Sequence, residues 1–146
     1  MEENREEIPQ KLKDYIFDLN QKTPFHRHLE INITDLKPGF CEAKLVVGKK
    51  HMNLMDVGHG GVVFSILDTV GGCAARTKGY EIVTSEMNIS YLNPVFEGEV
   101  LRGEGKVLKL GRSIVLVDGR LYRDKDDKLI SVSRQNLVNR GKLEID

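Results

Sequence analysis

The most informative segment of the chain is HMNLMDVGHGGVVFSILDTVGGCAA, residues 51–75. From about His59 onward, hydrophobic side chains recur with helical spacing, which predicts one long amphipathic helix. At about 100° per residue, one face of this helix gathers the apolar side chains that would enter a core: Val62, Val63, Ile66, Leu67, Val70, Cys73 and Ala74. The helix therefore has a core-facing side, and Asp68 does not lie on it.

The opposite face of the helix carries mostly small residues, namely Gly60, Gly61, Phe64, Asp68, Gly71, Gly72 and Ala75. A glycine inside a helix costs about 1 kcal/mol relative to alanine, so four on one face predict close approach of a ligand or another backbone. A mid-helix aspartate is most often a solvated surface residue. A solvated face, however, would carry Lys and Glu instead of Gly and Ala. An active site and a helix–helix subunit interface are both consistent with this pattern.

The start of the helix, GHGG at residues 58–61, exposes backbone N–H groups at the positive end of the helix dipole. Such a terminus suits a carbonyl oxygen that develops negative charge. Gly60 and Asp68 are eight residues apart, which separates them by about 12 Å along one helix. Both therefore reach one carbonyl only if Asp68 comes from a second subunit whose helix runs antiparallel, as in a two-fold dimer.

The rest of the chain predicts one further helix and a set of strands. The stripe in QKLKDYIFDLNQ predicts an N-terminal helix at about residues 9–22, and alternation at 29–36 and 41–48 predicts a hairpin. Four more strands are expected, and we interpret them as an antiparallel meander: residues 80–94, 98–110, 113–123 and 128–139. This is an α+β fold in which a long central helix lies against a curved antiparallel sheet.

Alternation along residues 80–94 divides the side chains of that strand between two faces. Val83, Met87, Ile89 and Tyr91 are expected on one face, and Thr84, Glu86, Asn88 and Ser90 on the other. Only one of these faces belongs to a core.

Composition limits the possible partners. A chain of 146 residues is about one domain long, so residues 1–146 are expected to form a single domain. Lys plus Arg and Asp plus Glu both number 22, which disfavours nucleic acid and acidic membrane surfaces as partners. The acidic N-terminus and the short apolar runs predict neither a signal peptide nor a membrane span. We expect a cytoplasmic protein.

No metal or cofactor is predicted. Cys41 and Cys73 have no CxxC or His/Cys spacing typical of zinc and are interpreted as small buried hydrophobes. His26 and His28 form an HxH pair, but no further ligands accompany them at suitable spacing.

Taken together, these residues resemble the hotdog-fold thioesterases, specifically the PaaI-type acyl-CoA thioesterases. The resemblance rests on Asn53, on HGG at residues 59–61, on Asp68 and on the strand TSEMNISYLNPVFEGE, and it extends from about residue 29 to residue 139. It implies a long helix wrapped by the sheet, protomers that pair their sheets edge to edge, and a homodimer or homotetramer. It also implies hydrolysis of an acyl thioester of coenzyme A or of an acyl carrier protein, with an aliphatic or aryl acyl group.

The resemblance also implies catalytic roles. Gly60 would polarise the thioester carbonyl through its N–H, and Asp68 of the partner subunit would be either the nucleophile or the general base that activates water. Asn53 would position the thioester or the water, and His59 would orient the sulfur side or support the loop. Thr84 matches a position at which family members carry a hydroxyl group near the catalytic carboxylate. It is equally well explained as an ordinary β-branched strand residue.

Substrate contacts are expected from Gly61, Phe64 and Asp56. Many family members have glycine where this chain has Asp56, so Asp56 is either a solvated loop residue or an influence on acyl or leaving-group preference. Basic residues that would contact coenzyme A phosphates are Arg76, Lys78, Lys109 and Arg112. The alternative function is a non-catalytic acyl-CoA-binding or regulatory module. A hotdog dehydratase is disfavoured because its differently spaced Asp/His motif is absent.

Overall fold

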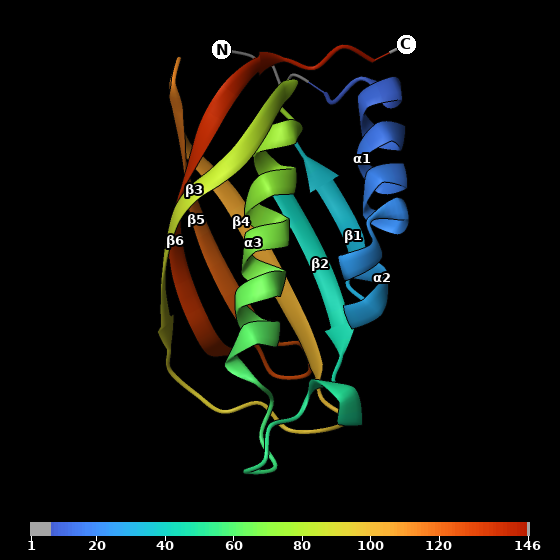
Figure 1. Cartoon of the computed structure of the whole chain (residues 1–146), viewed down its shortest axis with the longest axis vertical. Helices are drawn as coiled ribbons and strands as arrows, with labels where there is room; N and C mark the ends of the chain where they lie inside the picture. Colours follow the sequence, from blue (N-terminus) through green and yellow to red (C-terminus); the bar gives the residue numbers. More distant parts are fainter. Residues whose placement is uncertain (1–6, 146) are drawn as a thin grey trace.

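The computed structural model describes residues 7–145. In chain order, the elements are α1 (Gln10–Lys22), α2 (Pro24–Leu29), β1 (Asn32–Lys37), β2 (Phe40–Val46), the short 3₁₀ helix η1 (Lys49–His51), α3 (Gly60–Arg76), β3 (Tyr80–Tyr91), β4 (Val100–Leu110), β5 (Ile114–Arg123) and β6 (Lys128–Lys142). The six strands form one antiparallel sheet, which curves around α3 (Figure 1). This is the hotdog fold, and both the long central helix and the N-terminal helix are confirmed.

Helix α3 packs closely on the sheet because its apolar face is buried and because glycines line the strands beneath it. Ile66 and Val70 are fully buried. A Cβ on Gly103 would overlap the side chain of Ile66, and a Cβ on Gly105 would overlap the backbone of α3 at Val70. Glycine at these two positions of β4 therefore sets how near the helix lies to the sheet.

The small-residue face of α3 differs from expectation along half of its length. Gly60, Gly61 and Phe64 are at least partly exposed, but Gly71 and Gly72 are buried. The C-terminal half of this face is covered because Gln135 of β6 lies over Gly71 and Ile82 of β3 lies near Gly72. Asp68 lies half-buried where the open half meets the covered half.

The expected four-strand meander is wrong in one connection. The sheet order is β1-β2-β4-β5-β6-β3, so β3 pairs with β6 and β4 pairs with β2. The connection 92–99 makes no tight hairpin turn; it contains Pro94 and runs beside the end of β2, where the Val47 N–H donates to the Glu99 carbonyl at 2.9 Å. This pairing makes β3 an edge strand and places it next to the open face of α3.

A second helix, which the sequence did not predict, lies between α1 and the sheet. Residues 24–29 form α2, which has Pro24 at its first position and ends at Glu30 in a left-handed conformation. Strand β1 consequently begins at Asn32 instead of at residue 29. The expected burial of Cys41 and Cys73 is confirmed.

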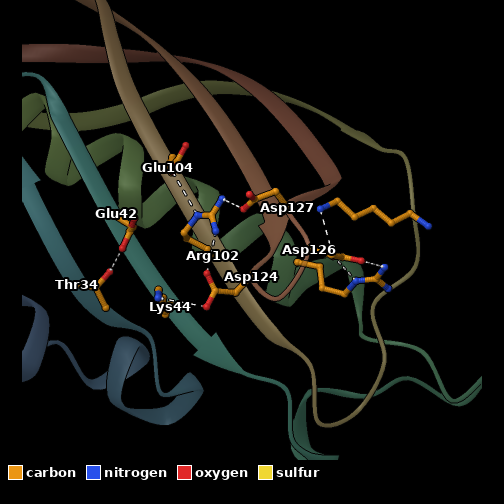
Figure 2. Close-up of polar contacts among 10 residues, drawn as sticks. Thr34, Glu42, Lys44, Arg102, Glu104, Asp124, Asp126 and Asp127 are labelled. Carbon is orange, nitrogen blue, oxygen red and sulfur yellow. Dashed lines mark hydrogen bonds and ion pairs between the residues drawn. The ribbon is translucent and has the colours of Figure 1, made fainter.

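The outer face of the sheet is polar at the end where β4 meets the β5–β6 turn. Figure 2 shows the Arg102 guanidinium among the carboxylates of Asp124 (2.9 Å), Asp127 (2.7 Å) and Glu104 (3.4 Å), while Lys44 contacts Asp124 at 3.3 Å. The partly exposed ion pairs of such a network each stabilise the fold by only about 0–1 kcal/mol. They identify this end of the outer face as a solvated surface.

Candidate active site

The Asp68 carboxylate is held by one of its two oxygens. Its Oδ1 accepts hydrogen bonds from Thr84 Oγ1 at 2.8 Å and from Gln135 Nε2 at 2.5 Å. Gln135 Nε2 also lies 2.9 Å from Thr84 Oγ1, which closes a triangle of polar groups. No hydrogen-bond donor from residues 7–145 contacts Oδ2. The carboxylate is thus fixed in orientation, with one oxygen left available for chemistry.

Gln135 is the residue of this cluster that sequence reasoning missed. It lies on β6, is only 2% exposed, and extends over Gly71 of α3, where a Cβ would overlap Gln135 Oε1. The only sign of its role in the sequence is a polar amide at a strand position whose side chain points inward. A buried amide needs hydrogen-bond partners, and the sequence alone does not identify them. The burial of Gly71 has the same explanation, because its missing side chain makes room for this glutamine.

A β-bulge brings Thr84 to Asp68. The pairing of β3 with β6 shifts register between Thr84 and Glu86, so strict alternation fails at that point. Thr84 therefore faces the helix, on the same side as Met87, instead of sharing a face with Glu86 as expected. Val83 points the other way and is 50% exposed. The Thr84 hydroxyl therefore lies against the Asp68 carboxylate, and its catalytic role stays a prediction.

At the start of α3, one backbone N–H group has no hydrogen-bond acceptor among the described residues. His59 is the N-cap of α3, and its Nδ1 accepts the Gly61 N–H at 2.8 Å. Tyr91 donates its hydroxyl to the Gly60 carbonyl at 2.9 Å. The Gly60 N–H, by contrast, donates to no acceptor within the described part of the chain. It therefore points a free N–H out of the positive end of the helix dipole.

The loop before α3 is closed by Asn53. Its Oδ1 accepts the N–H groups of Met55 at 2.8 Å and Val57 at 3.4 Å, and its own N–H donates to the Val57 carbonyl at 2.8 Å. Asp56 has φ of 58°, a left-handed conformation that glycine adopts freely and aspartate tolerates. Asp56 is exposed, and its predicted influence on substrate choice stays a prediction.

Gly60 and Asp68 line different pockets. Gly60 borders a pocket of 370 Å³ together with Tyr91 and Pro94, whereas Asp68 borders a pocket of 410 Å³ together with Thr84. Phe64 lies between them along the helix and is 39% exposed. Because the two groups are separated by about 12 Å along the helix, one chain does not bring both of them to one carbonyl.

His26 of α2 lies in the wall of the Asp68 pocket, a position that its HxH pattern did not predict. Its Nε2 lies 3.2 Å from the hydroxyl of Thr69. Burial and the positive charge of Arg76 lower the pKa of His26, and the charge of Asp68 opposes them. Within residues 7–145, no three His, Cys, Asp or Glu side chains are grouped closely enough to hold a metal ion.

The four basic residues expected to contact coenzyme A phosphates do not gather at one place. Arg76 lines the Asp68 pocket, Arg112 lines a different pocket beside Tyr80, and Lys78 packs near Gly39. The contact of these residues with coenzyme A phosphates stays a prediction.

Known proteins are similar to this chain in sequence and fold. Residues 55–130 match the Thioesterase superfamily. A putative esterase from Archaeoglobus fulgidus is 29% identical over 138 residues, which cover 84% of this chain and 88% of that protein. Human acyl-coenzyme A thioesterase 13 is 27% identical over 130 residues, with coverage of 87% and 93%. The solved structure of the Escherichia coli PaaI protein superposes with a TM-score of 0.86 at 23% identity, covering 92% of this chain and 97% of that one.

The superfamily match spans more than half of the chain, so the chain belongs to the thioesterase superfamily. It is an enzyme of the thioester hydrolase class, and the resemblance to PaaI-type proteins is confirmed. None of the described helices is long and apolar enough to cross a membrane.

The position of Gln135 predicts that this residue orients the Asp68 carboxylate for hydrolysis. Gln135→Met removes the amide donor but keeps a side chain of similar length. We expect kcat for thioester hydrolysis to fall about tenfold, because a hydrogen bond to a charged group is lost, while KM stays unchanged. Steady-state kinetics measure both constants.

Asn136→Met is the matched control, since it changes the neighbouring amide on the opposite face of β6. Its kinetics should equal those of the unaltered protein, and thermal melting should show both variants folded. A rise in KM without a fall in kcat for Gln135→Met would contradict the orienting role.

Proposed function

We propose that this protein is an acyl-CoA thioesterase that hydrolyses its substrate by carboxylate-assisted attack of water. The observation that carries the proposal is the Asp68 carboxylate, which Thr84 and Gln135 fix through one oxygen and whose other oxygen contacts no described donor. A carboxylate arranged in this way acts as a general base or as a nucleophile. Coenzyme A as the leaving group is supported by the name of the human relative, acyl-coenzyme A thioesterase 13.

The oxyanion site comes from a second copy of the chain. The Gly60 N–H is the unused donor at the start of α3, and stabilising a developing oxyanion often lowers the barrier to acyl transfer more than any other single effect. Because Gly60 lies about 12 Å from Asp68 of its own chain, an antiparallel pair of α3 helices is needed. Strand β3, twelve residues long, forms an edge of the sheet, and pairing with a second β3 would provide that two-fold arrangement.

The proposed reaction balances with water as the only co-substrate. Asp68 Oδ2 takes a proton from water as the water oxygen bonds to the thioester carbonyl carbon, and the carbonyl oxygen becomes negative beside the partner's Gly60. When the tetrahedral intermediate collapses, the carbon–sulfur bond breaks. The thiolate then takes the proton, so that a carboxylic acid and free coenzyme A leave. If Asp68 acts as nucleophile instead, its Oδ2 bonds to the thioester carbon, the carbon–sulfur bond breaks and coenzyme A leaves as the thiolate. Water then hydrolyses the acyl-enzyme anhydride, which releases the carboxylic acid, frees the Asp68 carboxylate and supplies the proton that the thiolate takes.

A thiol-release assay tests this proposal. The purified protein is mixed with a panel of coenzyme A thioesters, including acetyl, hexanoyl, decanoyl and phenylacetyl esters, and free thiol is measured with a chromogenic disulfide. We expect release of coenzyme A from at least one ester at a rate well above the uncatalysed rate. Binding measured by calorimetry without release would instead support the alternative, a non-catalytic acyl-CoA-binding module. Thiol release from acyl carrier protein esters alone would show a different carrier.

A further inference from the structure

We propose that the pocket beside Asp68 selects acyl groups that end in a carboxylate, with Arg76 as the residue that binds this carboxylate. The inference rests on the proposed thioesterase function and specifies its substrate class as coenzyme A esters of short dicarboxylic acids. Three features of the pocket carry it: its position, its unpaired cation and its length.

The pocket opens directly from the catalytic carboxylate. It has a volume of 410 Å³ and is lined by residues of the N-terminal helices, α3 and the first half of β3. Its wall is mixed: Leu19 and Ile82 are apolar, whereas Thr23, Thr69 and Thr84 present hydroxyl groups. A thioester carbonyl placed at Asp68 would therefore direct its acyl group into a pocket that accepts both methylene groups and a polar end.

Arg76 places a positive charge inside this pocket. Its guanidinium folds back along α3, so that Nη1 would lie 3.3 Å from a Cβ on Gly72. No carboxylate of residues 7–145 lies within ion-pair distance of Arg76, although arginines of the outer sheet face such as Arg102 and Arg120 have acidic partners. A half-buried guanidinium is stabilised by a carboxylate, which it binds through two parallel hydrogen bonds.

The spacing along α3 defines the length of the acyl group. Gly72, beneath the guanidinium, follows Asp68 by four residues, or about 6 Å along the helix axis. Glutarate and adipate span a distance of this order between their two carboxyl carbons. One end of such an acyl group would be the thioester carbon at Asp68, and the free carboxylate would reach Arg76.

The test compares two esters of equal carbon number, adipoyl-CoA and hexanoyl-CoA, which differ only in the terminal carboxylate. We expect the unaltered protein to have a higher kcat/KM for adipoyl-CoA. In Arg76→Gln, kcat/KM for adipoyl-CoA should fall about 10- to 100-fold through loss of a charged hydrogen bond, a much larger fall than for hexanoyl-CoA. Arg76→Lys, which keeps the charge but not the two-pronged geometry, should give an intermediate value.

The matched control is Arg120→Gln, which removes one arginine from the exposed outer face of β5 and should change neither ester. Thermal melting checks that Arg76→Gln is folded. An equal loss for both esters would mean that Arg76 contacts coenzyme A itself, and a preference of the unaltered protein for hexanoyl-CoA would mean that the pocket selects neutral chains. Either result overturns the inference while leaving the thioesterase proposal intact. Failure to hydrolyse any ester would refute the proposed function instead.

Discussion

Replacing Asp68 with asparagine is expected to lower kcat for acyl-CoA hydrolysis by about 10²- to 10⁴-fold, the range that a positioned general base contributes. The amide has the same shape, and its carbonyl oxygen still accepts the hydrogen bonds of Thr84 and Gln135. The side chain, however, loses its charge and presents an NH₂ group where Oδ2 lay. It neither takes a proton from water nor attacks a carbonyl, so the loss appears in kcat.

The measurement is steady-state thiol release, accompanied by thermal melting. Asp18→Asn is the matched control, because it removes a carboxylate from the exposed surface of α1, where Asp18 pairs with Lys22. This control should retain full turnover. A fully active, normally folded Asp68→Asn variant would exclude Asp68 as the catalytic carboxylate.

Removing the Gly60 N–H is expected to lower kcat by about 10²- to 10³-fold, the loss measured for a single oxyanion donor. Gly60→Pro does this with little disturbance, since proline is favoured at the first position of a helix. The preceding His59 already has the extended backbone, φ −63° and ψ 135°, that proline requires of its neighbour. The helix should therefore keep its start while losing the donor.

Gly60→Ala is the control for steric effects. A Cβ at residue 60 meets the ring of Tyr91 at 3.3 Å in either variant, but alanine retains the N–H. We expect Gly60→Ala to stay much more active than Gly60→Pro under the same thiol-release assay. Equal loss in both variants would show that crowding against Tyr91, and not the missing donor, limits turnover.

The Asp68→Asn and Gly60→Pro variants together test whether two subunits share one active site. When Asp68→Asn and Gly60→Pro chains are unfolded, mixed and refolded together, half of the dimers are mixed, and each mixed dimer has one intact site. Roughly a quarter of the original activity should then return. If both groups acted within one chain, the mixture would stay as inactive as its parts.

Much of the fold was predictable because it is encoded locally. The helical spacing of Val62, Ile66 and Val70 predicted α3 and its buried face, and turn residues separated the strands near their observed ends. The pairing of β3 with β6 was not predictable in this way. Strand order depends on contacts between distant segments, and consecutive strands often but not always pair.

Parts of the candidate site depended on tertiary structure for the same reason. Asp68 and Gly60 stood out in the sequence because an acidic residue and glycines in a helix need an explanation. Gln135 gave no such signal, since its role exists only through a contact between β6 and α3. Thr84 was placed on the wrong face because one bulged residue reverses the side on which all following side chains lie.

Local patterns in the sequence specify the central helix, its core side, the antiparallel strands and the two groups proposed to act on the thioester. These follow from periodicity and local backbone preference, which are properties of neighbouring residues. Tertiary contacts, by contrast, determine which strand lies beside α3, which oxygen of Asp68 is held, and that Arg76 shares the pocket of Asp68. These features arise from packing and hydrogen bonds between residues far apart in the chain, and no local pattern records them.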